Sequence, residues 1–361
     1  MPDEVTTLVV GTGPAGVMAA VGAAARGPVL MIDAFTLPRD KSCGGMIHPL
    51  SSEVLAPFGG VPESLLLTPA QVSFRYNDWD RGIIRDTDLY FLNVDRKPFD
   101  DWLLSLVPDA VRIADATRFV DWTPAPDGRI QARLSCRDAD GSARDVTVTC
   151  SYLVGADGPR STVRRSLAVP DTPHYITVQD YCRRVGELDP VFDCFWFSGI
   201  PGFAIGYVIP KNDRALVGLV YHPGTKRAHE LQDRALDKLR ERLPIGESLK
   251  REAWTAPRHR NLRDVVAGTG SVLLCGEAGG FISPTSGEGI SWALRSGRSA
   301  GAAIAACDPP DVLAAYSRDV EPLRRDIERR LRWFPWMNSR VGKTLAGMAP
   351  PAWVSKMTHN L

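Results

Sequence analysis

Hydrophobic and β-branched residues open the chain and then give way to a glycine-rich turn. Residues 5–10 predict a β-strand, and the alanine-rich residues 17–26 after the turn favour an α-helix. A second apolar run at residues 28–33 predicts another strand, and it ends in the acid Asp33. The order of strand, glycine turn, helix, strand and carboxylate is typical of a Rossmann-type dinucleotide-binding domain.

Each glycine of this turn, which reads Gly11-Thr-Gly13-Pro-Ala15-Gly16, has a predicted task. We expect Gly11 to permit the tight turn, Gly13 to let the backbone approach a pyrophosphate, and Gly16 to let helix and strand pack closely. The helix N-terminus near Ala15 would offer free N–H groups and a partial positive charge to phosphates. Asp33 is placed to accept hydrogen bonds from ribose hydroxyls. The turn by itself does not choose between FAD and NAD.

Two later apolar runs also end in turns that combine an acid with glycines. Residues 151–155 lead into Asp157 and an arginine-rich helix start, where the residues alone also suit a simple N-cap role for this aspartate. Residues 271–275 lead into Gly276-Glu277, and another helix opens after a proline-containing loop. Small residues dominate that helix, so we expect it to pack tightly against a sheet.

Two stretches with strand character carry no nucleotide signal and predict a second domain. The first is residues 71–93, and the second is residues 175–254, which include a β-hairpin with a polar turn at residues 211–214. We expect a substrate pocket where this sheet meets the nucleotide-binding domain. Ordinary core packing is an equal alternative for the aromatic side chains in it. The candidate wall residues are Trp196, Phe203, Ile205, Tyr207 and Pro284.

The predicted architecture is therefore an α/β chain with interleaved domains. From residue 309 to residue 361 the pattern turns helical and basic, and predicts a helix pair whose alternating charges at residues 324–332 face solvent. Trp333 and Trp336 beside these charges leave membrane or partner contact as an alternative. The assignment is 1–70, 94–168 and 259–308 to the nucleotide-binding domain, 71–93 and 169–258 to the substrate domain, and 309–361 to a C-terminal helical segment.

The composition narrows the classes of function. The chain has 361 residues and a formal net charge of +1, so its overall charge does not favour nucleic acid or an anionic membrane. The six histidines show no metal-ligand spacing, and the seven cysteines include no C-x-x-C pair, so we expect no metal site. Without a signal-peptide pattern or an apolar run of bilayer length, the sequence predicts a cytoplasmic protein.

Three motifs in this order resemble those of the FAD-dependent oxidoreductases with the p-hydroxybenzoate hydroxylase-type fold. Two further segments, K-x-C-G-G at residues 41–45 and R-x-x-F-D-x-x-L at residues 96–103, are similar to the geranylgeranyl reductase-like branch of that family. The resemblance implies FAD rather than NAD, and an antiparallel β-sheet as the substrate domain. The residues that it assigns to FAD are Gly11, Gly13, Ala15, Gly16, Asp33, Arg39, Cys43, Gly44, Gly45, Arg96, Asp157, Gly276, Glu277, Gly287, Gly289 and Ile290.

The resemblance also implies where the ends of FAD lie. In that family the carboxylate after the third motif strand holds the ribityl chain, and the next helix N-terminus faces N1 and C2=O of the flavin ring. A helix N-terminus suits the negative charge that a reduced flavin carries near N1. This chain departs from the family at Glu277, which replaces an aspartate, so its extra methylene would displace the ribityl contact.

The predicted hairpin departs from the family as well. Its spacing from Pro210 to Gly218 matches the reductases, but Ile205 and Tyr207 replace the first two aromatic residues of their Y-x-W-x-F-P pattern. The same two residues replace both tryptophans of the W-x-W-x-I-P pattern of the related halogenases, which argues against halogenation. The framework is shared with these enzymes, whereas the predicted substrate differs.

Two residues in or near the K-x-C-G-G segment are candidate catalytic groups. Cys43 would face the flavin with its thiol, although packing in a tight loop is the favoured alternative. His48 would reach the flavin edge as an acid or base near neutral pH, with a plain hydrogen-bonding role as its alternative.

The leading functional hypothesis is a flavin monooxygenase that acts on an apolar or aromatic substrate. NAD(P)H would donate electrons by transient binding, because the chain has no second Rossmann fingerprint. Related flavoproteins hydroxylate a tryptophan of a partner protein during quinone cofactor maturation, which extends the hypothesis to a protein substrate. The alternatives are reduction of an isoprenoid C=C bond and a flavin-binding module without turnover.

Overall fold

The computed structural model describes residues 1–137 and 141–337, in two compact units. The first unit comprises residues 1–40, 97–172 and 259–331, and the second comprises residues 41–96 and 173–258 with the described residues after 331. Each unit has its own eight-stranded sheet, which confirms the predicted α/β class. Besides shifts of a few residues at 94–96 and 169–172, the division differs from the predicted one in two longer segments. Residues 41–70 group with the second unit, and residues 309–331 group with the first.

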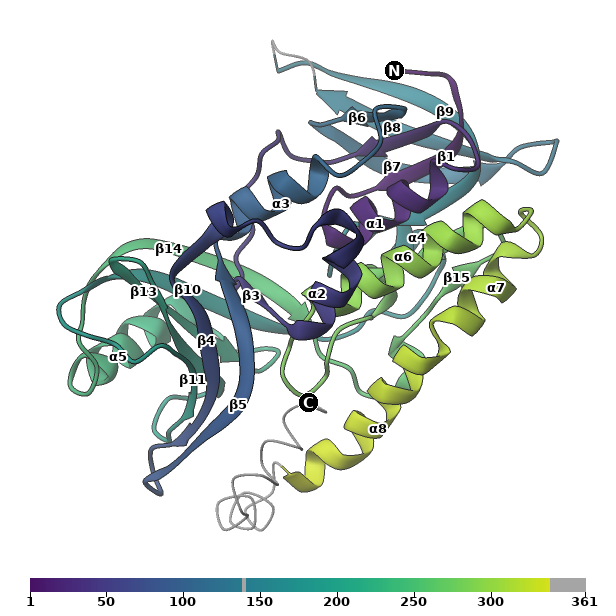
Figure 1. Ribbon diagram of the computed structural model, residues 1–361. Helices are drawn as coiled ribbons and strands as arrows, with labels where there is room; N and C mark the ends of the chain where they lie inside the picture. Colours follow the sequence, from purple (N-terminus) through teal and green to yellow (C-terminus); the bar gives the residue numbers. More distant parts are fainter. Residues whose placement is uncertain (138–140, 338–361) are drawn as a thin grey trace. The chain divides into compact units, whose positions relative to one another are not determined.

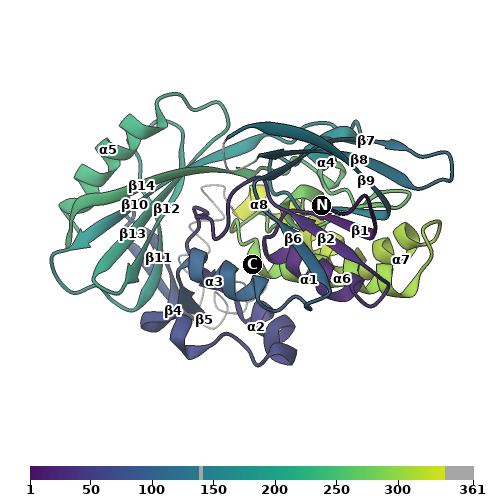
Figure 2. The same cartoon turned by 90° about the horizontal axis from the view of Figure 1, so that it is seen from above.

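The first unit is built on a mostly parallel sheet with the opening strand near its centre (Figure 2). β1 (Glu4–Val10) lies between β2 (Val29–Ile32) and β9 (Ala143–Gly155), and all three run parallel. β7 and β8 continue the sheet from β9 as an antiparallel extension. The remaining strands are β6 (Val111–Ala114), β7 (Thr117–Pro124), β8 (Ile130–Arg137), β15 (Gly268–Thr269) and β16 (Val272–Leu274).

The predicted strand–turn–helix–strand order is present in this unit. α1 (Pro14–Ala23) makes the crossover from β1 to β2, as parallel neighbours require. The helix begins and ends three residues earlier than predicted. Pro14 stands in its first turn, where the missing N–H is not needed and the fixed φ already suits a helix.

Helix α6 (Ile290–Ala306) packs against α1 through small residues on both helices (Figure 1). A Cβ atom on Gly297 would lie 2.1 Å from the Ala15 carbonyl oxygen, and a Cβ atom on Gly301 would lie 2.7 Å from the Ala19 carbonyl oxygen. The close contact of this small-residue helix is therefore with another helix and not with the sheet, which corrects the prediction. The contact between α6 and α1 fixes the start of α1 beside the glycine turn.

Short helices and turns complete the first unit. α7 and α8 confirm the predicted C-terminal helix pair as far as residue 337; the predicted segment after that lies outside the described residues. No helix in the described ranges is long and apolar enough to cross a membrane. These elements are α3 (Arg96–Leu104, which starts at the unit boundary), α4 (Thr162–Ser166), η3 (Leu262–Asp264), η4 (Gly276–Gly279), α7 (Val312–Asp319) and α8 (Glu321–Met337).

The second unit contains the other sheet, in the order β14-β10-β13-β12-β11-β4-β5-β3. Its pairs are antiparallel except β11 with β4. The strands are β3 (Met46–Ile47), β4 (Leu66–Asp78), β5 (Ile83–Val94), β10 (His174–Arg184), β11 (Val191–Trp196), β12 (Phe203–Lys211), β13 (Arg214–Tyr221) and β14 (Ile245–Pro257). The helical elements are α2 (Pro49–Leu55), η1 (Ala56–Phe58), η2 (Glu63–Leu65) and α5 (Ala228–Arg240).

Helix α5 interrupts a stretch that the sequence analysis assigned to strands. Leu231, Ala235, Leu236 and Leu239 are buried at helical spacing and pack into the core on one face of the sheet. We call this face, with Phe195, Phe197 and α5, the helix face. The opposite face carries a second cluster around Phe91 and Ile209, which we call the aromatic face.

Glycines on β12 and β13 leave room for aromatic rings from the neighbouring strands to lie over them, on both faces of the sheet. A Cβ atom on Gly218 would lie 2.0 Å from the Tyr207 ring, and one on Gly206 would lie 2.4 Å from the Phe195 ring. The spacing from Pro210 to Gly218, noted in the sequence, thus has a steric reason. The β12–β13 hairpin pairs Tyr207 with Gly218, so the ring of Tyr207 can lie flat over the neighbouring strand.

Candidate functional site

The glycine turn of the first unit is close-packed everywhere except at its middle glycine. Gly11 has φ +106°, and a Cβ atom on it would lie 2.3 Å from the Ala156 carbonyl oxygen. A Cβ atom on Gly16 would lie 1.9 Å from the Gly11 carbonyl oxygen. The same atom on Gly13 would meet only Nη2 of Arg39, at 3.6 Å. The backbone at Gly13 is therefore open, as the close approach of a pyrophosphate requires.

Asp33 ties this turn to the end of β2. Its carboxylate accepts hydrogen bonds from the Thr12 hydroxyl at 2.6 Å and from Nε of Arg39 at 3.1 Å, and a further one from the Phe35 N–H. Burial raises the pKa of Asp33, but the Arg39 charge and these hydrogen bonds outweigh it and hold the pKa below its usual value. The carboxylate is therefore ionised, and the cation Arg39 is held beside Gly13. The contact with ribose stays a prediction.

Two acids of the later motifs lie close to each other's turns. Asp157 accepts hydrogen bonds from the Ser161 hydroxyl and the Thr162 N–H, so it caps free N–H groups at the start of α4 from outside the helix. The N-cap residue itself is Ser161, and not Asp157 as the residues alone had suggested. The Glu277 carboxylate lies between the turn that contains Gly158 and the turn that contains Gly289. Its oxygens are 3.9 Å from the Cβ position of Gly158 and 3.7 Å from that of Gly289. The second and third motifs therefore converge on Glu277.

Two buried basic side chains support η4, from which Glu277 projects. Arg164 donates to the carbonyl oxygens of Ala278 and Asp264 at 3.1 and 3.0 Å. His259 Nε2 lies 2.7 Å from the Gly280 carbonyl oxygen, so this nitrogen carries the proton. Burial lowers the pKa of His259, which favours the neutral ring. No local sequence pattern singles out His259, because its partner is a backbone carbonyl 21 residues away.

The start of α6 holds a carboxylate that the FAD assignment did not include. Glu288 accepts from the Ser291 N–H at 2.8 Å and from the Ser291 hydroxyl at 2.5 Å. Burial raises the pKa of Glu288, and the hydrogen bonds from Ser291 and the charge of Arg330 lower it in part. Gly287 has φ +69°, and apart from its chain neighbours none of the described residues has an atom within 4 Å of its Cβ position, so they leave space in front of this helix start.

Arg330 is another residue that the sequence analysis did not single out. It belongs to the charge-alternating part of α8 that was predicted to face solvent, yet its exposed fraction is 8%. Its guanidinium lies 5.6 Å from the Trp292 ring centre, and Nη1 is 3.5 Å from the Ser283 hydroxyl. Charge alternation could not show this, because the burial comes from how α8 packs on the loop before α6.

In the second unit, the predicted Cys43-Gly44-Gly45 turn packs on β12. Gly45 has φ +66°, and a Cβ atom there would lie 2.0 Å from the Val94 carbonyl oxygen and 2.9 Å from Nζ of Lys211. Lys211 is 1% exposed and donates to the Val94 carbonyl oxygen at 2.7 Å. Cys43 is a half-buried free thiol. The turn therefore rests on a buried lysine, which the sequence did not single out.

Lys211 gives the folded protein a pH dependence that can be measured. Burial lowers its pKa from 10.5 to about 7, so the burial of Lys211 costs no stability above pH 10.5, and the cost grows as the pH falls towards 7. We expect wild-type unfolding free energy to gain about 2 kcal/mol from this group between pH 7 and pH 9. Lys211→Met should lack that gain in denaturant titrations, whereas the exposed-site variant Lys226→Met should keep it. Parallel pH profiles for wild type and Lys211→Met would contradict this account.

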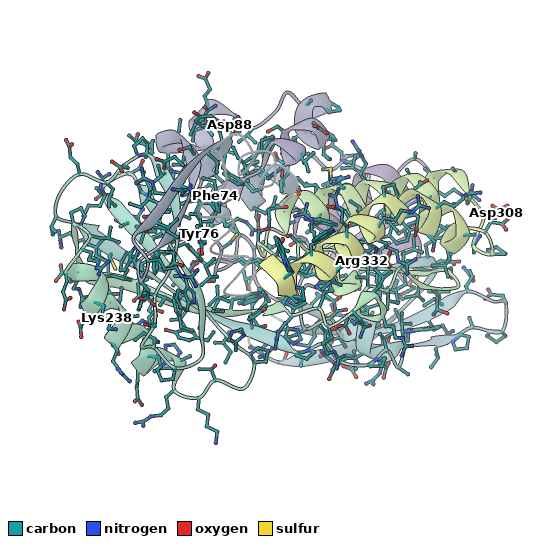
Figure 3. The ribbon with its side chains drawn as sticks, turned by 90° about the horizontal axis from the view of Figure 1, so that it is seen from below. Phe74, Tyr76, Asp88, Lys238, Asp308 and Arg332 are labelled. Carbon is teal, nitrogen blue, oxygen red and sulfur yellow. The ribbon has the colours of Figure 1, made fainter. Side chains whose placement is uncertain are left out.

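The aromatic face continues from this turn across β5, β11 and β12. Phe192 makes edge contacts with Phe74 and Tyr207, with ring centres 5.7 and 5.9 Å apart. All three rings are half-buried, and Figure 3 shows Phe74 and Tyr76 in succession along β4. His48 lies at the border of this face. It caps α2 by accepting from the Leu50 N–H, and its ring is 5.6 Å from that of Phe91.

Tyr207 brings a hydrogen-bonded hydroxyl to the aromatic face. Its hydroxyl donates to Oε1 of Gln179 at 3.1 Å, and Nε2 of Gln179 donates to Glu252 at 2.8 Å. Burial raises the pKa of Tyr207, so the hydroxyl keeps its proton. The phenolic oxygen can still accept a hydrogen bond from a bound molecule.

The structure divides the predicted pocket walls between the two faces of the sheet. Phe203 is buried in the core of the helix face, and Trp196 packs against that core, which matches the core-packing alternative of the sequence analysis. A β-bulge between Phe203 and Ile205 causes this result, because one extra residue reverses the alternation of side chains. Ile205 and Tyr207 are half-buried on β12, and Tyr207 packs against the aromatic-face cluster.

Two further predicted site residues lie in the kind of element where the sequence analysis placed them. Arg96 is buried at the start of α3, where the sequence placed a helix start. Pro284 lies half-buried in the loop before α6. Their contacts with FAD or substrate stay predictions.

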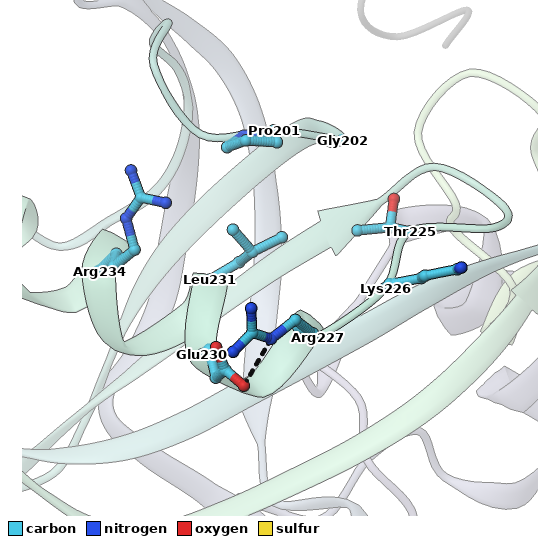
Figure 4. A pocket seen from close by; sticks show the side chains of 8 residues that line it. All are labelled: Pro201, Gly202, Thr225, Lys226, Arg227, Glu230, Leu231 and Arg234. Atoms are coloured by element: carbon cyan, nitrogen blue, oxygen red, sulfur yellow. Dashed lines mark hydrogen bonds and ion pairs between the residues drawn. The ribbon is translucent and has the colours of Figure 1, made fainter.

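A surface pocket of about 280 Å³ lies at the start of α5 in the second unit (Figure 4). Its lining includes the exposed cations Lys226, Arg227 and Arg234, and Nε of Arg227 donates to Glu230 at 2.8 Å. None of the predicted site residues lines it. It is therefore separate from the candidate site.

The residues of the first unit fit an FAD molecule. The open backbone at Gly13 and the cation Arg39 suit a pyrophosphate, and the unfilled space at Gly287 suits a ring near the start of α6. Residues 105–330, more than half of the chain, match the FAD-binding domain family. The chain is also 29% identical over 326 residues to Protein CbrA from Shigella flexneri serotype 5b (strain 8401), with 88% of this chain and 85% of the relative covered.

Solved structures share the fold. A geranylgeranyl bacteriochlorophyll reductase-like protein from Thermoplasma acidophilum has a TM-score of 0.78 at 19% identity, over 98% of this chain and 90% of that one. Aklavinone-11 hydroxylase, in a ternary complex with FAD and aklavinone, has a TM-score of 0.62 at 22% identity, over 85% of this chain and 63% of that one. The protein has the fold of FAD-dependent oxidoreductases, and it belongs to the FAD-binding domain family.

Proposed function

We propose that this protein is an FAD-dependent monooxygenase that hydroxylates an apolar aromatic substrate carrying a hydrogen-bond donor. The observation that carries the proposal is the aromatic face, where the half-buried rings of Phe74 and Phe192 lie beside Tyr207, whose hydroxyl is fixed by Gln179. Rings pack well against the flat faces and edges of other rings, which favours an aromatic substrate. The fold shared with a hydroxylase that binds FAD and aklavinone supports the same reading.

Residues of the first unit would hold the cofactor. The turn at Gly13 and the α1 N-terminus would bind the pyrophosphate, with Arg39 as a counter-charge. Glu277 and Gly289 would contact the ribityl chain and the ring. Once NAD(P)H has reduced it, bound FAD would supply two electrons to O2, so that with two protons one oxygen atom enters a substrate C–H bond and the other leaves as water.

The second unit would orient the substrate. The Tyr207 oxygen would accept a hydrogen bond from a phenol or an indole N–H, since its own proton is committed to Gln179. Gln179 is buried and held by Glu252, so the acceptor is fixed in direction. Cys43, Gly44, Gly45 and Arg96 remain proposed FAD contacts of this unit.

Isotope labelling tests the proposal. FAD-loaded protein would be incubated with NADPH, oxygen-18 gas and either 4-ethylphenol or indole. We expect a product that gains one oxygen-18 atom by mass spectrometry. Tyr207→Phe should weaken probe binding about tenfold and leave FAD binding unchanged, because it removes one hydrogen bond to the probe.

Other outcomes would point to the other hypotheses. Uptake of hydrogen by geranylgeraniol under argon, with no oxygen-18 in either aromatic probe, would overturn the monooxygenase in favour of C=C reduction. Oxygen-18 found only in a tryptophan of a co-purified protein would move the substrate from a small molecule to a partner. Reduced protein that does not consume oxygen would favour a flavin-binding module.

A further inference from the structure

The start of α6 carries two opposite charges that the proposed function does not use. The carboxylate of Glu288 occupies the N–H and hydroxyl of Ser291 in the first turn. The guanidinium of Arg330 reaches the same region from α8, over Trp292 and near Ser283. Burial raises the pKa of Glu288, and the Arg330 charge lowers it in part.

Two further carboxylates, those of Asp326 and Glu277, belong to the elements around Glu288 and Arg330. On α8, Asp326 binds Arg330 at 2.8 Å and also binds Arg329, whose side chain is 54% exposed. On η4, the carboxylate of Glu277 lies 3.7 Å from the Cβ position of Gly289. The Glu288 carboxylate offsets the partial positive charge of the α6 N-terminus, whereas the Arg330 guanidinium, partly neutralised by Asp326, adds to it.

We propose that Glu288 and Arg330 shift the reduction potential of the bound flavin in opposite directions. The inference rests on the proposed binding of FAD with its ring near the start of α6. Reduced flavin carries negative charge, so a carboxylate at the helix start disfavours reduction and a guanidinium favours it. Glu288 and Arg330 are thus positioning residues for the electrostatic field at the cofactor and take no part in bond making.

Midpoint potentials of FAD-loaded variants test the proposal. Glu288→Gln should raise the potential and Arg330→Gln should lower it, each by about 30 mV, which is a tenfold change for a two-electron couple. Arg330→Lys keeps the charge and should stay close to wild type. Arg329→Gln is the matched control, because it pairs with the same Asp326 from the exposed side of the helix and should cause no shift.

The sign of the two shifts decides the result. Shifts in the same direction, or shifts no larger than that of Arg329→Gln, would overturn the inference. Loss of FAD from both Glu288→Gln and Arg330→Lys would also overturn it, since the pair would then serve only to hold the fold. Opposite shifts without oxygen-18 incorporation would keep this inference and reject the monooxygenase, so the two failures are distinguishable.

Discussion

Gly297→Val is expected to lower the free energy of unfolding by about 3 kcal/mol or more. A Cβ atom at this position would lie 2.1 Å from the Ala15 carbonyl oxygen and 2.8 Å from the Ala15 carbonyl carbon. These are backbone atoms in the first turn of α1, so no side chain can move aside to make room. The helices would have to separate, and the contact that fixes the glycine turn would open. Denaturant unfolding followed by circular dichroism measures the loss.

The control for this variant lies on the same helix. Ala302 is exposed on α6, so Ala302→Val adds the same β-branched side chain without a neighbour to meet. We expect it to change the free energy of unfolding by less than about 1 kcal/mol, through helix propensity alone. Equal unfolding midpoints for the two variants would show that α1 and α6 do not pack as closely as described.

Gly13→Val is expected to keep the fold and lose the cofactor. Gly13 has φ −74° and ψ −179°, which valine adopts readily, and its Cβ position meets only the end of the Arg39 side chain. A valine there would cover the backbone that a pyrophosphate must approach. We expect the affinity for FAD to fall about 100-fold, or about 3 kcal/mol, measured by fluorescence titration of the apoprotein.

A neighbouring glycine separates cofactor loss from unfolding. Gly16→Val would bring a side chain within 1.9 Å of the Gly11 carbonyl oxygen, so we expect it to destabilise the protein itself. Gly13→Val should instead unfold with a midpoint close to that of the wild-type apoprotein. Wild-type FAD affinity in Gly13→Val would rule out the turn as the phosphate site.

Features of the candidate site that depend on short segments were predictable. The strand, glycine turn, helix and Asp33 lie within the first 33 residues, and the turn needs glycine at Gly11 for its positive φ. The capping role of Asp157 was also among the predicted alternatives, because a cap and its helix are adjacent in sequence. Local sequence suffices where the partners are a few residues apart.

Features that depend on distant partners were not predictable. Arg330 looked like any other arginine of an alternating run, and only its position against Trp292 and Ser283 shows that it is buried. Phe203 looked like its aromatic neighbours, and a bulge in β12 turned it to the helix face. A one-residue bulge moves every later side chain of the strand to the opposite face of the sheet, and the local sequence pattern does not predict the bulge.

The sequence by itself determined the α/β class, the FAD-binding motifs and their order, because glycine conformations and strand–helix alternation are local properties of the chain. The tertiary structure decided which charges stand at the start of α6, which rings line the aromatic face, and that Lys211 is buried beneath Gly45. The reason is physical: burial and electrostatics depend on which distant segments pack together, and side chains from β4, β5, β11 and β12 meet only when the sheet forms.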